Sequence, residues 1–155
     1  PLAADDYLPV ELADPPIAVP TATSLNLRSD SGRRLAPAGH ERAGKVVLDV
    51  VHAAEPTPLA AVYALRAGGG EAPLSIAGLS ARDALLTLAA ELHRLDPKSP
   101  ELLRAELDHL QALAVSVRVA RLSYPRRFDV GPEVIAAITE DLRRSLSPAR
   151  DRSPG

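Results

Sequence analysis

The 155-residue chain contains no cysteine, methionine or tryptophan, and aromatic residues make up only 3% of it. Without cysteine it has no disulfide, no thiolate metal ligand and no cysteine nucleophile. The scarcity of aromatic rings leaves the core to Leu, Val, Ile and Ala, and it removes the stacking platforms that bind single-stranded nucleic acids. No apolar run approaches the roughly 20 residues of a membrane-spanning helix, so we expect no membrane association.

A large excess of either charge is also missing, since the formal net charge is -2 and the hydrophobic fraction is 46%. This balance is typical of an ordinary globular domain, and it favours neither a strongly basic nucleic-acid binder nor a disordered acidic chain. Abundant arginine and alanine with little lysine indicate a GC-rich bacterial or phage genome. The N-terminal stretch lacks the basic-then-apolar pattern of a secretory signal, so we expect a cytoplasmic protein. Pro1 fits either a trimmed initiator methionine or a tag remnant.

The most informative stretch is 44–95, where alternating apolar residues give way to helical spacing. We expect an α+β domain in which a small antiparallel sheet of three to four strands packs on about three helices in two layers. The connections are short, so the sheet is most simply a meander, with Gly68–Gly70 as a hairpin connection. Four segments read as its strands: Ser24–Arg28, Gly44–Ala54, Leu59–Ala67 and Pro73–Gly78.

Three helices are indicated by their N-terminal signals. Ser80, with Asp83 three residues on, caps a helix that runs to Leu95. Ser99 and Pro100 begin a second helix, and Gly131-Pro132 opens a third. Residues 29–42 are polar and contain glycine, which predicts a loop.

The course of residues 101–124 is ambiguous. Leu103, Leu107, Leu110 and later apolar residues repeat at heptad spacing, whereas the valines after Ala114 alternate as in a strand. No Gly, Pro or Asn separates the two patterns, and a change from helix to strand normally needs such a residue. We therefore expect one helix from Pro100 to about Ser123. The alternative is a helix to about Leu113 followed by a strand.

Proline and charge patterns suggest boundaries for the domain. Residues 1–22 are proline-rich and acidic without a basic residue, which predicts an extended arm, either loosely packed or serving as a linear motif for a partner. Residues 23–147 form the single α+β domain. Residues 148–155 form a polar tail.

No catalytic, cofactor-binding or metal-binding motif emerges. A G-x-S-x-G elbow, a phosphate loop and a dinucleotide fingerprint are all missing. Glu106 and His109 form only half of the Glu-x-x-His arrangement used by di-iron bundles, so we expect no metal. His40, His52 and His93 have no partner that the sequence identifies. We assign no catalytic residue and no cofactor.

Two groups of residues are candidates for binding surfaces. A continuous helix from Pro100 would be long for this domain, and its surplus apolar length could be buried by a second copy; the interface residues would be Leu103, Leu107, Leu110 and Val117. The C-terminal part of the chain has a modest excess of arginine, which could contact phosphates if the side chains converge. This possible nucleic-acid patch consists of Arg118, Arg121, Arg126, Arg127, Arg143 and Arg144.

The absence of a catalytic constellation favours a non-catalytic interaction or accessory module of a bacterial or phage system. We expect it to form a homodimer or to bind a partner protein. The alternative is a nucleic-acid-associated regulator that uses the C-terminal arginines. A further alternative is an enzyme whose polar groups converge only in the folded chain, with His52, His93 or His109 beside a carboxylate in a pocket.

Overall fold

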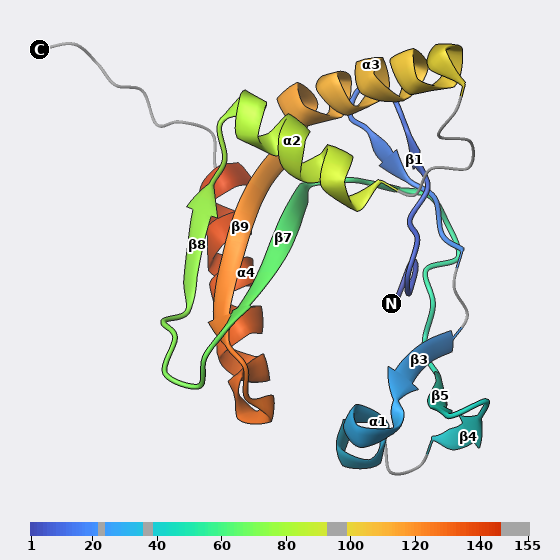
Figure 1. The fold of residues 1–155 in the computed structure, drawn as a ribbon, viewed down its shortest axis with the longest axis vertical. Helices are drawn as coiled ribbons and strands as arrows, with labels where there is room; N and C mark the ends of the chain where they lie inside the picture. Colours follow the sequence, from blue (N-terminus) through green and yellow to red (C-terminus); the bar gives the residue numbers. More distant parts are fainter. Residues whose placement is uncertain (22–23, 36–38, 93–98, 147–155) are drawn as a thin grey trace, which may run out of the picture. The chain divides into compact units, whose positions relative to one another are not determined.

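The computed structural model describes residues 1–21, 24–35, 39–92 and 99–146 (Figure 1). The chain divides into two compact units, Pro1–Leu59 and Ala60–Gly155. The described residues form four α-helices and nine strands in small sheets, so the predicted α+β class is confirmed. The predicted arm, domain and tail boundaries stay predictions.

The first unit contains two small antiparallel sheets. Strand β2 (Ile17–Ala18) lies between β1 (Val10–Glu11) and β6 (Thr57–Pro58). The second sheet places β5 (Lys45–Asp49) between β3 (Ser24–Arg28) and β4 (His40–Arg42). Its core residues are Val46 and Val47, which are buried in the central strand.

The loop expected over 29–42 is wrong, because the structure places helix α1 (Ser29–Leu35) and strand β4 there. Asp30 in the first turn and arginines in the last turn complement the helix dipole. Gly32 lets this helix approach β5 closely: a Cβ at this position would lie 2.3 Å from the Cβ of Val46. A sequence window that is locally polar is thus held in a helix by tertiary contact.

The hairpin between β4 and β5 follows from its turn residues. Ala43 has a φ of 50° and Gly44 a φ of 75°, and the flanking residues Arg42 and Lys45 are paired. Positive φ at both central positions is the requirement of a type I′ turn, whose twist matches that of the flanking strands.

The second unit is built around a mixed sheet of three strands. Strand β9 (Arg118–Pro125) is central, parallel to β7 (Ala61–Gly68) and antiparallel to β8 (Ser75–Gly78). The expected meander and the hairpin at Gly68–Gly70 are therefore wrong, since β7 and β8 are separated by β9. The helical connection between β8 and β9 gives the chain the length that it needs to return parallel to β7.

The helix from Pro100 to about Ser123 is also wrong, and the alternative with a strand is correct in kind. Helix α3 spans Pro100–Ser116, and Val117 then adopts an extended conformation that leads into β9. Val119, Ala120 and Leu122 are all buried, as expected for a central strand covered on both faces. The burial of this strand decides the conformation, so no breaker residue is needed.

The helix starts agree with their predicted caps. Ser80 precedes α2 (Ala81–Glu91), and its hydroxyl oxygen accepts from the backbone N–H of Asp83 at 3.2 Å and donates to the Asp83 carboxylate at 2.7 Å. Ser99 accepts from the N–H of Leu102 at 3.3 Å, with Pro100 in the first turn of α3. Helix α2 ends at Glu91 and Leu92 is extended, so the predicted continuation of this helix is wrong at Leu92; residues 93–95 lie outside the described residues.

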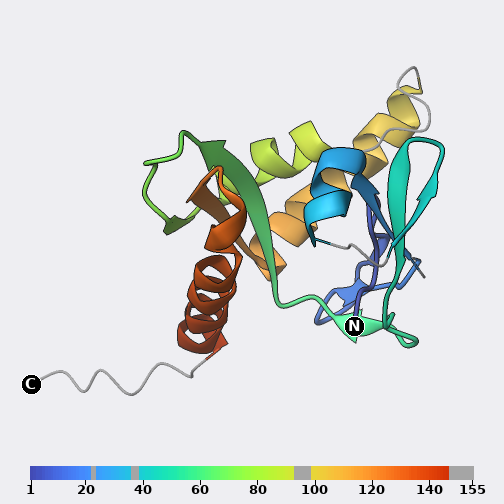
Figure 2. The ribbon, with the colours of Figure 1, turned by 90° about the horizontal axis from the view of Figure 1, so that it is seen from below.

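Helices lie on both faces of the β7-β9-β8 sheet (Figures 1 and 2). Helix α4 (Gly131–Leu146) follows a short 3-10 turn (Phe128–Val130) and covers one face, while α2 and α3 cross one end of the other face. Within the described residues, no helix is both long enough and apolar enough to cross a bilayer.

Candidate functional site

The most developed polar site lies between the sheet and α4 and joins three side chains. Asp141 of α4 is only 6% exposed. Its Oδ1 accepts from Arg118 Nη2 at 2.8 Å, and its Oδ2 accepts from Arg118 Nε at 2.9 Å and from the Tyr63 hydroxyl at 2.8 Å. Because Tyr63 belongs to β7 and Arg118 to β9, this cluster ties α4 to two neighbouring strands.

The electrostatics of this cluster hold each group in one protonation state. The hydrogen bonds from Arg118 keep the pKa of Asp141 below its ordinary value, despite burial, which acts in the opposite direction. Burial, together with the hydrogen bond to Asp141, raises the pKa of Tyr63 to about 12. The same carboxylate raises the pKa of Arg118. At neutral pH the cluster is therefore an ion pair with a neutral phenol.

These properties are those of a structural clamp. A general base needs a pKa near the working pH and a free lone pair aimed at a substrate. Here the carboxylate is ionised and already accepts three hydrogen bonds, and the phenol holds its proton well above neutral pH. The arrangement fixes α4 on the sheet and does not activate a nucleophile.

The sequence analysis did not single out Tyr63 or Asp141. One signal was present, because Val134, Ile138 and Asp141 follow the i, i+4, i+7 spacing of one helix face. An acidic residue on an apolar face predicts a buried partner of opposite charge. The partner itself could not be named, because Arg118 was expected on a helix.

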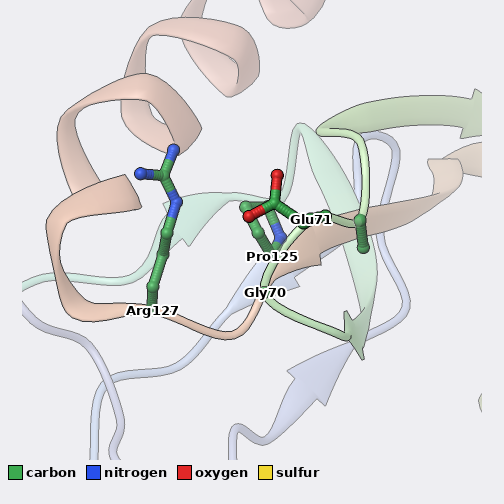
Figure 3. A pocket seen from close by; sticks show the side chains of 5 residues that line it. Gly70, Glu71, Pro125 and Arg127 are labelled. Atoms are coloured by element: carbon green, nitrogen blue, oxygen red, sulfur yellow. The ribbon is translucent and has the colours of Figure 1, made fainter.

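Two hollows lined by described residues of the second unit do not hold a set of catalytic groups. One, of about 280 Å³, is lined by Gly70, Glu71, Ala72, Pro125 and Arg127 (Figure 3). Arg127 extends toward the start of α4, where it pairs with Asp129 at 2.9 Å and Glu133 at 3.6 Å, and not toward Glu71. Another, of about 410 Å³, lies at the junction of α3 and β9, where Arg118, Ser116 and Ser145 line it together with apolar residues.

The described histidines do not form a metal site. His40 lies in β4, His52 forms an isolated bridge with Leu2, and His109 lies exposed on α3. In the part of the chain that the structure describes, no group of three or more His, Asp or Glu side chains is placed to hold a metal ion. His93 lies outside the described residues.

The structure separates the four predicted interface residues. Leu110 and Val117 are buried in the core of the second unit, at 8% and 6% exposure. Leu107 and Leu103, one and two turns nearer the start of α3 than Leu110, are 50% and 36% exposed. Only this first half of the apolar row is accessible to a partner.

The six arginines of the predicted patch are distributed over different surfaces. Arg118 points toward α4, while Arg121, three residues on in the same strand, points to the opposite face of the sheet. Arg144 pairs with Glu140 on the surface of α4 at 3.7 Å. Arg126 and Arg127 follow β9, and Arg143 lies in the last turn of α4. The arginines do not all converge on one surface.

An unpaired sheet edge is a further feature that could bind a partner. Strand β7 is eight residues long, pairs with β9 on one side, and pairs with no described strand on the other. It contains no proline and no lysine, and Arg66 is its single charged residue, so it has few of the side chains that commonly protect such edges. Leu65, at its centre, is 69% exposed.

Comparison of the chain with protein-family models, curated proteins and solved structures gives no match.

Proposed function

We propose that the protein is a non-catalytic interaction module that self-associates by pairing strand β7 with β7 of a second copy. The observation that carries this proposal is the free outer edge of β7, which offers a row of backbone N–H and C=O groups over eight residues. Such an edge binds an extended strand through main-chain hydrogen bonds. An identical edge is complementary to it, because two antiparallel copies satisfy each other's groups.

Symmetry restricts the register of this pairing. A twofold axis perpendicular to the sheet keeps each face of the sheet on the same side in both copies, so every residue lies opposite a residue whose side chain points to the same face. The axis must therefore pass between one residue and the same residue of the second copy. Centring on Arg66 would place two like charges directly opposite each other, which is unfavourable. Centring on Leu65 places the two exposed leucines side by side and sets Arg66 opposite Ala64 of the second copy.

The expected stability of the dimer is modest. Full burial of a leucine contributes about 1.5–3 kcal/mol, so covering Leu65, which is 69% exposed, would contribute about 1–2 kcal/mol per chain. A single strand edge buries less than a standard interface, so we expect dissociation at roughly micromolar concentration. The interaction would therefore respond to the local concentration of the protein.

Light scattering coupled to size exclusion, at several loading concentrations, tests the proposal. The wild-type chain should shift from monomer to dimer as concentration rises, and Leu65→Lys should remain a monomer. Leu86→Lys is the matched control, because Leu86 is a 59% exposed leucine of helix α2 and does not belong to strand β7. It should dimerise as the wild type does. Wild-type protein that stays monomeric at every concentration would refute the proposal.

The half-exposed leucines of α3 are the competing interface, and the same experiment separates the two. If Leu107→Lys abolishes dimerisation while Leu65→Lys does not, α3 is the interface and the edge-strand pairing is wrong. If Leu65→Lys abolishes dimerisation while Leu107→Lys does not, Leu107 is exposed but does not take part in the dimer interface.

A further inference from the structure

The face of the β7-β9-β8 sheet opposite α4 carries two arginines among small side chains. Tyr63 and Arg118 point toward α4, so the alternation of a strand places Arg66 and Arg121 on the other face. In the register of the sheet, Arg121 lies between Ala64 and Ala77, and Arg66 lies beside Ser123, which neighbours Ser75. We call this surface, Arg66 and Arg121 with Ala64, Ala77, Ser75 and Ser123, the arginine face.

Both arginines are exposed and lack a compensating charge. The three strands contain Arg66, Arg118 and Arg121 and no acidic residue. Asp141 neutralises Arg118 on the α4 side. Among the described residues, no carboxylate lies within ion-pair distance of Arg66 or Arg121. The small neighbouring side chains leave their guanidinium groups accessible.

We infer that the arginine face binds the phosphate backbone of a nucleic acid. Guanidinium groups are planar, permanently charged and able to form paired hydrogen bonds with phosphate oxygens. Arg66 and Arg121 are diagonal neighbours on adjacent parallel strands, which lie about 4.8 Å apart, so their guanidinium groups can engage the same strand of a polyanion. Serine hydroxyls beside Arg66 offer further donors. No aromatic side chain lies on this face, so contacts are to phosphates and independent of base sequence.

The proposed dimer would extend this surface, and to that extent the inference rests on the proposed function. With Leu65 at the twofold axis, both arginine faces lie on the same side of a joined six-stranded sheet. Arg66 of each copy then becomes a diagonal neighbour of Arg66 of the other. Their mutual repulsion weakens the dimer in the absence of an anion, and a phosphate chain lying across all four arginines removes it. Nucleic acid and dimerisation should therefore promote each other.

The test uses fluorescence anisotropy of a labelled oligothymidine of about 20 nucleotides, with the full chain, between about 50 and 200 mM salt. Arg66→Ala/Arg121→Ala should weaken binding at least about tenfold and lower the salt slope by about 1.4, the value for two phosphate contacts on a single strand. The control Arg143→Ala/Arg144→Ala, which removes the same charge from α4, should change affinity less than about twofold. Equal losses in both variants, or no binding by the wild type, would overturn the inference.

Two further measurements separate a failure of phosphate binding by the arginine face from a failure of the proposed dimerisation through β7. Polyglutamate of similar length serves as a competitor: displacement as effective as that by unlabelled oligothymidine would show that only charge is recognised and would refute the phosphate assignment. The oligomeric state is measured in the same samples. A dimer that does not bind oligothymidine refutes the arginine face alone. A monomer that binds it through Arg66 and Arg121 refutes edge pairing alone.

Discussion

Replacing Asp141 with asparagine tests whether the Tyr63–Arg118–Asp141 cluster is the clamp that fastens α4 to the sheet. The substitution keeps the side-chain volume and removes the charge. It also replaces an acceptor oxygen with an NH₂ group that faces the donors of Arg118 and Tyr63. Asp141 accepts three hydrogen bonds at 2.8–2.9 Å, so at least one donor loses its partner.

The magnitude follows from the exposure of the two charges. Removing one partner of a fully buried ion pair costs about 3–5 kcal/mol. The side chain of Asp141 is 9% exposed but that of Arg118 is 32% exposed, so water can partly resolvate the arginine. We therefore expect a loss of about 2–3 kcal/mol in the free energy of unfolding, which lowers the urea midpoint by roughly 1–2 M.

Circular dichroism of the helical signal is the suitable assay, because the chain has no tryptophan and three of its four described helices lie in this unit. Asp129→Asn is the matched control: it breaks an ion pair of similar length with Arg127, but Asp129 is 71% exposed. Its expected cost is below about 1 kcal/mol. A loss for Asp141→Asn no larger than that of the control would refute the clamp.

The ion pair of Asp141 with Arg118 predicts how the stability of the protein responds to acid. The pKa of Asp141 is lowered by folding, so the stability that it contributes is present above its ordinary pKa of 3.8. This contribution is lost as pH falls through the lowered value. The difference in stability between the wild type and Asp141→Asn should accordingly narrow below that pH. A difference that stays constant down to acid unfolding would contradict an ionised, paired carboxylate.

Two other predictions concern the same unit. Spectrophotometric titration should show a tyrosine ionisation near pH 12, and Tyr63→Phe should remove that transition. Because the pKa of Tyr63 is raised in the folded state, the stability from this proton should be present below about pH 10 and fall as pH rises toward 12. A titration in which Tyr63→Phe removes no transition near pH 12 would contradict the buried hydrogen bond. Leu122→Ala should lower the free energy of unfolding by about 2–5 kcal/mol, because Leu122 is fully buried in β9. Leu107→Ala, at a 50% exposed position, should lower it by less than about 1 kcal/mol. Similar losses for the two variants in urea unfolding would contradict the assigned core.

The features that the sequence predicted correctly are those that depend on neighbouring residues. The caps at Ser80 and Ser99 and the strand at Ser24–Arg28 each rest on a few adjacent side chains. Helix α1 and the central position of β9 depend on residues distant in the chain. Helix α1 packs closely against Val46 at Gly32, and β9 depends on hydrogen bonding to its neighbours β7 and β8.

The arginines illustrate how one such error propagates to a candidate site. On the expected long helix, Arg118 and Arg121 are three residues apart and share a face. On the observed strand they point to opposite faces, so one is neutralised by Asp141 and the other is exposed on the arginine face. The sequence could not identify Arg66 as the neighbour of Arg121, because the parallel pairing of β7 with β9 depends on the crossover through α2 and α3.

Hydrogen exchange of the β7 backbone amides, measured at protein concentrations below and above the dissociation constant, tests edge pairing most directly. In a strand, successive N–H groups point to opposite sides, so alternate amides of Ala61–Gly68 face the free edge. Those amides should exchange rapidly in dilute protein and become protected at high concentration, while the exposed turns of α3 stay unchanged. A dimer in which β7 exchange is independent of concentration would contradict the account.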